Sequence, residues 1–119
     1  MVRDWPGLKA LALQMDLPEV TVDYPHGHEC LKAFGKLWCH WSPYADGAVF
    51  KAERQEREML IAAEPDTFFL HPHYANYDYV LVRAGRIHPD WARARLLRRW
   101  RDNAPKRWLK AWDLEQGAD

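Results

Sequence analysis

The sequence predicts a two-layer α+β domain, with an antiparallel sheet and helices packed mainly on one face. Two observations lead to this class. Segments with helical periodicity alternate with groups of short segments rich in β-branched and aromatic residues, and the connections within each group are too short for parallel crossovers. The expected order is α-β-β-β-α-β-β-α(-α). The 119 residues suffice for one core, so we expect a single domain over residues 1–119.

Three segments have strong helical signals. The first follows Asp4, a suitable N-cap, and has apolar residues at i, i+3, i+4 and i+7 from Leu8 until Pro18 ends it. Residues 53–63 form a good helix by propensity, with acids near the start as the helix dipole prefers. Residues 88–103 predict another helix, and Pro105 suits the first turn of a short last one.

The strand signals lie between these helices. Residues 30–34, 36–41 and 47–52 read as three strands separated by turn residues, and residues 66–70 and 79–83 as two more. The segment TVDYP at 21–25 is ambiguous because of its proline.

The two cysteines lie on either side of the expected hairpin turn at Gly35 and Lys36. A two-residue loop there would place Lys32 opposite Cys39, so that Cys30 and Cys39 share a face diagonally, about 7 to 8 Å apart. This separation is long for a disulfide. We therefore expect free thiols, although a one-residue change of register would alter the distance between the two cysteines on which this expectation rests.

Charge and hydropathy exclude several classes of protein. No signal peptide is recognisable and no window approaches about 18 consecutive apolar residues, so we expect a cytoplasmic, monomeric protein with no membrane partner. There is no Walker loop, no GxGxxG element and no GxSxG elbow. These absences favour a non-enzymatic protein without catalytic residues or a cofactor.

The net charge of zero hides a strongly basic segment. Residues 83–110 carry ten Lys and Arg against two acids, whereas residues 1–82 carry seven basic and twelve acidic groups. A helical wheel places Leu96, Leu97, Trp100 and Ala104 on one arc and four arginines on the opposite one. The candidate phosphate-binding residues are Arg95, Arg98, Arg99, Arg101, Lys106, Arg107 and Lys110. The alternative to phosphate binding is that these residues form a solvated helix face, paired with acids of the same protein such as Glu53, Glu56 and Glu58.

Histidines and tyrosines gather in HPHYANYDYV at residues 71–80. His71 with His73, and His26 with His28, are HxH pairs that could share a metal on strands, but Pro72 and Gly27 indicate loops, so no metal site is expected. The tyrosines could stack on a base or a flat ligand, as could Trp38 and Trp41, or they could be core packing. If helices cover one face of the sheet only, the other would expose an aromatic patch suited to binding.

Several short motifs resemble the MmcQ/YjbR family. They are the GK at residues 35–36, HYANY followed by VLVR at residues 73–83, and a tryptophan, Trp100, four residues before APKR at residues 104–107. The resemblance implies the same order of elements, described in the family as a double-wing arrangement, and a DNA-binding label that members carry on the basis of this shape. This chain departs from the family in having Arg95, Arg98 and Arg99 where members often have acids.

Two functions follow from these observations. The first is DNA binding through the Arg-rich helix and the APKR turn. The second is a protein-interaction or small-ligand module that uses the exposed sheet face and the segment of residues 71–80, called the His/Tyr loop, with His73, Tyr74 and Tyr77 as contact residues.

Overall fold

The computed structural model describes residues 1–117, and it has the predicted α+β class with one strand more than expected. The elements are α1 (Trp5–Gln14), β1 (Val20–Asp23), η1 (Pro25–Gly27), β2 (Cys30–Ala33), β3 (Lys36–Trp41), β4 (Gly47–Lys51), α2 (Arg54–Ala63), β5 (Phe68–Phe69), η2 (Pro72–Tyr74), β6 (Tyr79–Arg83), α3 (Pro89–Asn103) and α4 (Lys106–Gln116). The extra strand is β1, in the segment that the proline left ambiguous. All neighbouring strands are antiparallel, in the order β1-β2-β3-β4-β6-β5.

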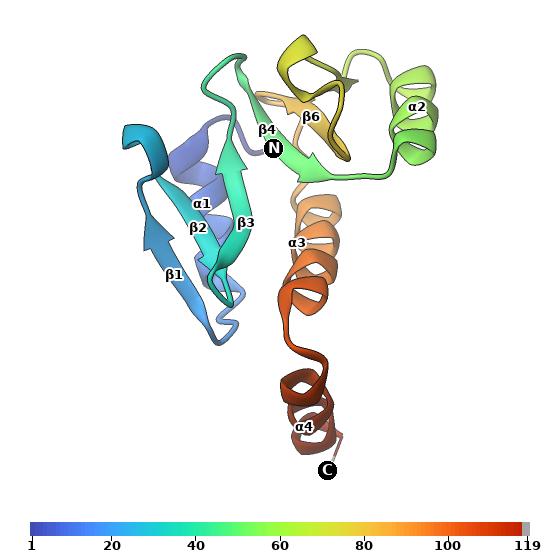
Figure 1. Cartoon of the computed structure of the whole chain (residues 1–119). Helices are drawn as coiled ribbons and strands as arrows, with labels where there is room; N and C mark the ends of the chain where they lie inside the picture. The colour runs from blue at the N-terminus through green and yellow to red at the C-terminus, as the bar shows by residue number, and fades with distance from the viewer. Residues whose placement is uncertain (118–119) are drawn as a thin grey trace.

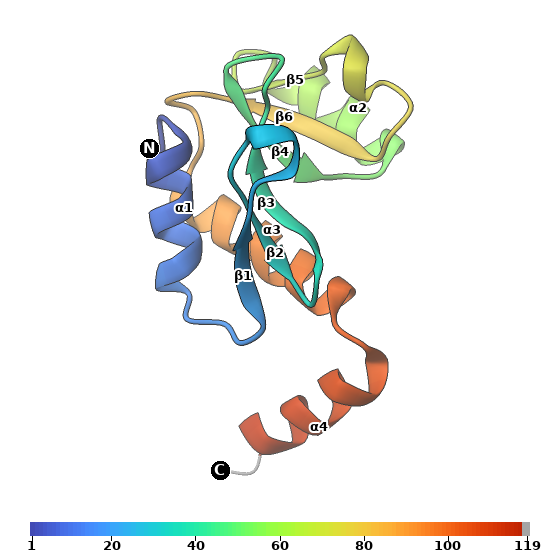
Figure 2. The same ribbon diagram turned by 60° about the vertical axis from the view of Figure 1, so that its left-hand side comes forward.

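The helices α1, α2 and α3 cover one face of the sheet, as the sequence predicts (Figures 1 and 2). Asp4 is the N-cap of α1, and its carboxylate accepts a hydrogen bond from the N–H of Gly7 at 2.9 Å. Trp38 of β3 and Trp100 of α3 are fully buried between the layers. The Nε1 of Trp38 donates to the carbonyl of Leu96 at 2.8 Å, so the sheet is hydrogen-bonded to α3 as well as packed on it.

The alternation of side chains along the strands defines the second face. His40, Val49, Leu81 and Phe69 are cross-strand partners in one row, so their side chains point to the same side of the sheet. Val49 and Leu81 form a small second core on this side with Tyr74. The loop that carries Tyr74 therefore covers part of the face that the helices leave free.

The register of the β2–β3 hairpin differs from the prediction. The turn residues are Phe34 and Gly35, both with positive φ (56° and 75°), and Ala33 pairs with Lys36. A bulge then shifts the register, so that Leu31 rather than Lys32 lies opposite Cys39. Cys30 and Cys39 consequently point to different faces, and the expectation of free thiols is confirmed.

The expectation that Trp38 could stack on a ligand is also wrong. It lies in the core with no exposed surface and cannot stack on a ligand, whereas Trp41 remains partly exposed. Of the two hairpin tryptophans, only Trp41 can contribute to a binding surface.

The last helix, α4, extends beyond the sheet in both views (Figures 1 and 2). It contacts the domain through Trp108 and Trp112, whose rings lie 5.8 Å and 4.9 Å from that of Trp100. Among the residues that the structure describes, no helix is both long and apolar enough to cross a membrane.

Candidate functional site

A groove lies on the second face of the sheet, at the end of the molecule opposite to α4. It has a volume of about 540 Å³, within the range of small-molecule sites. We call it the aromatic groove. Its lining residues are Pro25, His26, His28, Glu29, Cys30, Leu37, His40, Trp41, Pro43, Tyr44, His73, Tyr74, Tyr77 and Tyr79. They come from η1 and the residues after it, the β2–β3 hairpin, the β3–β4 turn, the His/Tyr loop and β6.

The structure places the three predicted contact residues of the His/Tyr loop in this lining, in different environments. Tyr74 is 5% exposed, and its hydroxyl hydrogen-bonds the Oγ of Ser42 at 2.8 Å, so it is first of all a packing residue. His73 is exposed and stacks on Tyr44 with a centroid distance of 4.0 Å. Tyr77 is 55% exposed, so its ring is accessible, unlike that of Tyr74.

The β3–β4 turn brings Tyr44 to the groove, which the sequence did not predict. Ser42 holds this turn, because its Oγ accepts hydrogen bonds from the N–H groups of Tyr44 (3.1 Å) and Ala45 (3.2 Å). Nothing in the spacing of the turn residues indicates that they approach residues 71–79, so the contact arises only from the tertiary fold.

Arg57 of α2 holds the His/Tyr loop against the domain. It is 6% exposed, and its guanidinium donates to the carbonyl oxygens of Tyr77 (2.8 Å) and Tyr79 (3.0 Å) and, more weakly, Ala75 (3.4 Å). A guanidinium is suited to this because its donors form a fixed, planar fork. Arg57 therefore positions the aromatic rings although it does not line the groove.

His40 contributes the most unusual polar group of the groove. Its Nδ1 is sealed from solvent and has no hydrogen-bond partner among the described residues. Burial, with the nearby charge of Arg99 as a second cause, lowers the pKa of His40 from 6.5 to about 3. The imidazole is therefore neutral at physiological pH.

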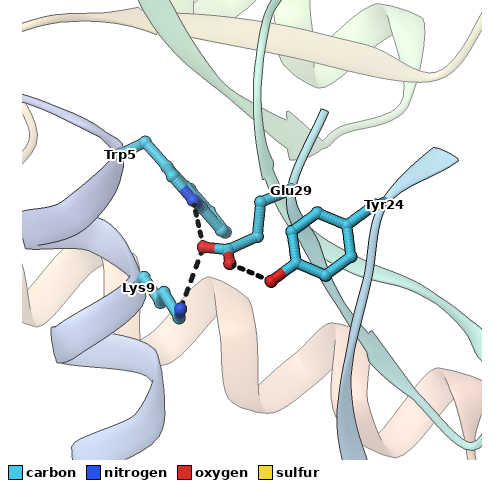
Figure 3. A network of polar contacts seen from close by, with 4 residues as sticks. All are labelled: Trp5, Lys9, Tyr24 and Glu29. Atoms are coloured by element: carbon cyan, nitrogen blue, oxygen red, sulfur yellow. Dashed lines mark hydrogen bonds and ion pairs between the residues drawn. The ribbon is translucent and has the colours of Figure 1, made fainter. Parts of the chain in front are cut away.

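Glu29 lies at the rim of the groove in a network of polar contacts (Figure 3). Its Oε1 accepts hydrogen bonds from the Nε1 of Trp5 and the Nζ of Lys9, both at 2.9 Å, and its Oε2 accepts one from the hydroxyl of Tyr24 at 2.9 Å. The contact with Lys9 is the main cause, followed by those with Trp5 and Tyr24, that lowers the pKa of Glu29 from 4.5 to about 2. The carboxylate is therefore ionised at neutral pH.

The basic residues of α3 do not form the single exposed face that the helical wheel predicted. Arg99 is 7% exposed and donates to the carbonyl of Trp38 at 3.2 Å, whereas Leu97 is 40% exposed, so these two assignments are wrong. The reason is geometric: a residue three positions after Leu96 lies about 60° from it on a helix, on the buried side.

Two further arginines of the predicted set form ion pairs. Arg95 makes two hydrogen bonds to the carboxylate of Glu56, at 2.9 and 2.7 Å, and Arg101 makes two to that of Asp113, at 2.9 and 2.8 Å. The pairing of Arg95 with an acid of α2 corresponds to the alternative considered for this face. Within residues 1–117, the predicted cations outside such pairs that are also exposed are Arg98, Lys106, Arg107 and Lys110.

The histidine pairs do not assemble a metal centre in the described part of the chain. No group of three or more His, Cys, Asp or Glu side chains is placed there to hold a metal ion. Pro25–Gly27 and Pro72–Tyr74 are short 3-10 turns rather than strands, so the two histidines of each pair are not held on one strand face.

The fold and the groove together define a class of protein: a small α+β domain whose antiparallel sheet has helices on one face and an aromatic hollow on the other. A family model described as YjbR matches residues 15–102. The chain belongs to this family. The match ends before α4 and includes every residue of the aromatic groove. Comparison with curated proteins and with solved structures gives no match.

Proposed function

We propose that this protein binds a small planar aromatic molecule in the aromatic groove. The observation that carries the proposal is the convergence of Trp41, Tyr44, Tyr77 and Tyr79 on one hollow of about 540 Å³. Concave sites of this size, with mostly apolar walls and a few polar groups, are typical of small-molecule binding. Stacking on aromatic side chains contributes about 1 to 3 kcal/mol per ring.

The groups in the groove favour binding over covalent catalysis. Cys30 lines the groove, but burial raises the pKa of its thiol, which keeps it protonated and weakly nucleophilic at neutral pH. The hydroxyl of Ser42 is occupied by Tyr74 and by two backbone N–H groups of its own turn. Neither residue has a base placed to activate it among its described partners.

Titration with indole, observed by NMR, tests this proposal. We expect chemical-shift changes concentrated on the rings of Trp41, Tyr44 and Tyr77 and on the backbone of residues 71–79. The variant Tyr77→Ala should weaken binding about tenfold, the loss of one stacking contact. The matched control is Met59→Ala, which removes a side chain that is 68% exposed on α2 and outside the groove. Changes spread evenly over the surface, or equal affinities of the two variants, would contradict the proposal.

Nucleic-acid binding is the second candidate function. It is favoured by three exposed cations in the first half of α4, Lys106, Arg107 and Lys110, together with Arg98 on α3. Such side chains contact phosphates and make the affinity depend on salt. The groups available are fewer than the sequence suggested, because Arg95, Arg99 and Arg101 are engaged within the protein.

Fluorescence anisotropy with duplex and single-stranded DNA tests the second candidate. The variant Arg107→Glu/Lys110→Glu should abolish binding, whereas Arg54→Glu/Arg86→Glu, with the same change of charge at exposed positions outside α3 and α4, should retain most of it. Binding that does not weaken between 50 and 200 mM salt would count against phosphate contacts, since four such contacts should lower the affinity roughly 10²-fold over this range.

A further inference from the structure

The aromatic groove is unusual in the charges that it presents to a ligand. Among the residues that the structure describes, its lining contains no Lys or Arg, and Glu29 is its only carboxylate. The contacts from Lys9, Trp5 and Tyr24 keep this carboxylate ionised. An anionic ligand would therefore lose water without gaining a cation in the lining.

A cationic ligand meets a different obstacle. The guanidinium of Arg99 lies 5.4 Å from the centroid of the Tyr79 ring, and the Nζ of Lys51 lies 5.7 Å from the same centroid. Neither side chain lines the groove, but both place positive charge next to one of its aromatic walls. At the rim, Lys9 lies 2.9 Å from Glu29 and offsets its charge, so the carboxylate is not a free counter-ion for a cation.

His40 is a partly buried polar residue of the groove lining that has no charge at neutral pH and a ring nitrogen that is unpaired within the described part of the chain. Its ring packs edge-on against Tyr79, with a centroid distance of 5.9 Å; because its Nδ1 is sealed from solvent, a ligand can meet only the other edge of the ring, which carries Nε2. A neutral imidazole offers one N–H donor and one lone pair. It can therefore pair with an uncharged amide or hydroxyl group without a cost for burying charge.

We propose that the ligand of the aromatic groove is an uncharged planar ring compound with a polar group such as an amide, and that the groove rejects the anionic and cationic forms of the same ring. This inference rests on the proposed small-molecule function and specifies the chemical class of the ligand.

Three probes with one ring and three charges test the inference by isothermal titration calorimetry at pH 7. They are indole-3-acetamide (neutral), indole-3-acetate (negative) and tryptamine (positive). We expect the acetamide to bind at least tenfold more tightly than the acetate and at least threefold more tightly than tryptamine. An acetate or tryptamine affinity equal to or above that of the acetamide would overturn the inference. Binding of indole itself would still support the proposed function, and failure of all four compounds would remove both.

The variant Glu29→Gln identifies the source of the discrimination. Without the carboxylate, the preference for the acetamide over the acetate should fall below threefold. Glu58→Gln, on the exposed side of α2, is the matched control and should leave the preference unchanged. Because Glu29 also ties α1 to the residues after η1, the wild-type protein should be titrated at 20 and 500 mM salt as a second measurement. At 500 mM salt, screening should narrow the preference for the acetamide over the acetate. A preference that depends neither on salt nor on Glu29 would contradict the role assigned to this carboxylate.

Discussion

At the scale of single residues, the aromatic groove depends on side chains whose environments differ from what their types suggest. His40 is an imidazole held neutral on an aromatic sheet face, and Tyr74 is a loop tyrosine that is almost fully buried. The burial of Tyr74 follows from the position of the His/Tyr loop, which covers the second small core of the sheet. The residues accessible to a ligand are therefore those around this covered part, chiefly Tyr77, Tyr44 and Trp41.

His40 should make the stability of the protein depend on pH. The unfolded chain binds a proton on this imidazole near its ordinary pKa of 6.5, whereas the folded protein does so only near a pKa of about 3. Stability is therefore fully present above pH 6.5 and is lost as the pH falls toward 3, with a slope of up to about 1.4 kcal/mol per pH unit. We expect His40→Gln to remove this slope between pH 4.5 and 6.5, measured by urea unfolding.

Between pH 4.5 and 6.5, the effect of His40 on stability is separate from that of Glu29. The pKa of Glu29 is lowered, so its contribution is present above pH 4.5 and is lost between pH 4.5 and about 2. His28→Gln, which removes an exposed imidazole from the same groove, is the matched control. If the two histidine variants change the slope equally, the neutral state assigned to His40 is wrong.

At the scale of elements, α2 determines the position of the His/Tyr loop through Arg57. The variant Arg57→Ala leaves the carbonyl oxygens of Tyr77 and Tyr79 without the guanidinium and removes a buried side chain. We expect a loss of about 3 kcal/mol in the free energy of unfolding, the range for breaking a buried charged interaction. Hydrogen exchange of the amides of residues 75–79 should accelerate, and indole binding should weaken.

Arg54→Ala is the control on the same helix. Its side chain is exposed, so its stability should change by less than about 0.5 kcal/mol. Unchanged exchange of residues 75–79 in Arg57→Ala would show that the loop is held by its own packing, and the positioning role of Arg57 would then be refuted.

The β2–β3 hairpin shows why sequence periodicity predicted the elements but not their register. The strands were predicted from their composition, but the turn was expected one residue too late. A bulky residue such as Phe34 rarely adopts a positive φ. Here its ring packs against Trp100 at 5.4 Å and Trp108 at 4.7 Å, contacts that come from distant helices. The sequence around the turn contains no signal of them.

The same distinction applies to the candidate sites. His73, Tyr74 and Tyr77 could be selected from the sequence because they stand close together in an aromatic segment. Tyr44 and Arg57 could not, because a turn and a helix far away in the chain bring them to the loop. On α3, the composition predicted a basic surface, but the pairing of Arg95 with Glu56 and the burial of Arg99 depend on the packing of that helix.

At the scale of the whole molecule, the two candidate functions lie at opposite ends. The aromatic groove is formed by residues between 25 and 79. Three of the four cations proposed to contact nucleic acid lie on α4, which extends beyond the other end of the sheet (Figure 2). The family match covers the groove but ends at residue 102, before α4. A chain that ends after Ala104 should therefore separate the functions, because it lacks Lys106, Arg107 and Lys110 but contains every lining residue of the groove.

We expect this shortened chain to fold cooperatively but to be less stable by about 2 to 4 kcal/mol, because Trp108 and Trp112 no longer cover Trp100 and Phe34. Arg101→Ala is the control for the ion pair to Asp113, which is solvent-exposed and should contribute less than about 1 kcal/mol. Urea unfolding measures the stability of the shortened chain and of Arg101→Ala. At a temperature where the shortened chain is folded, it should bind indole like the full chain and lose any affinity for DNA. Loss of indole binding from the folded, shortened chain would show that α4 supports the groove, against the separation argued from the fold.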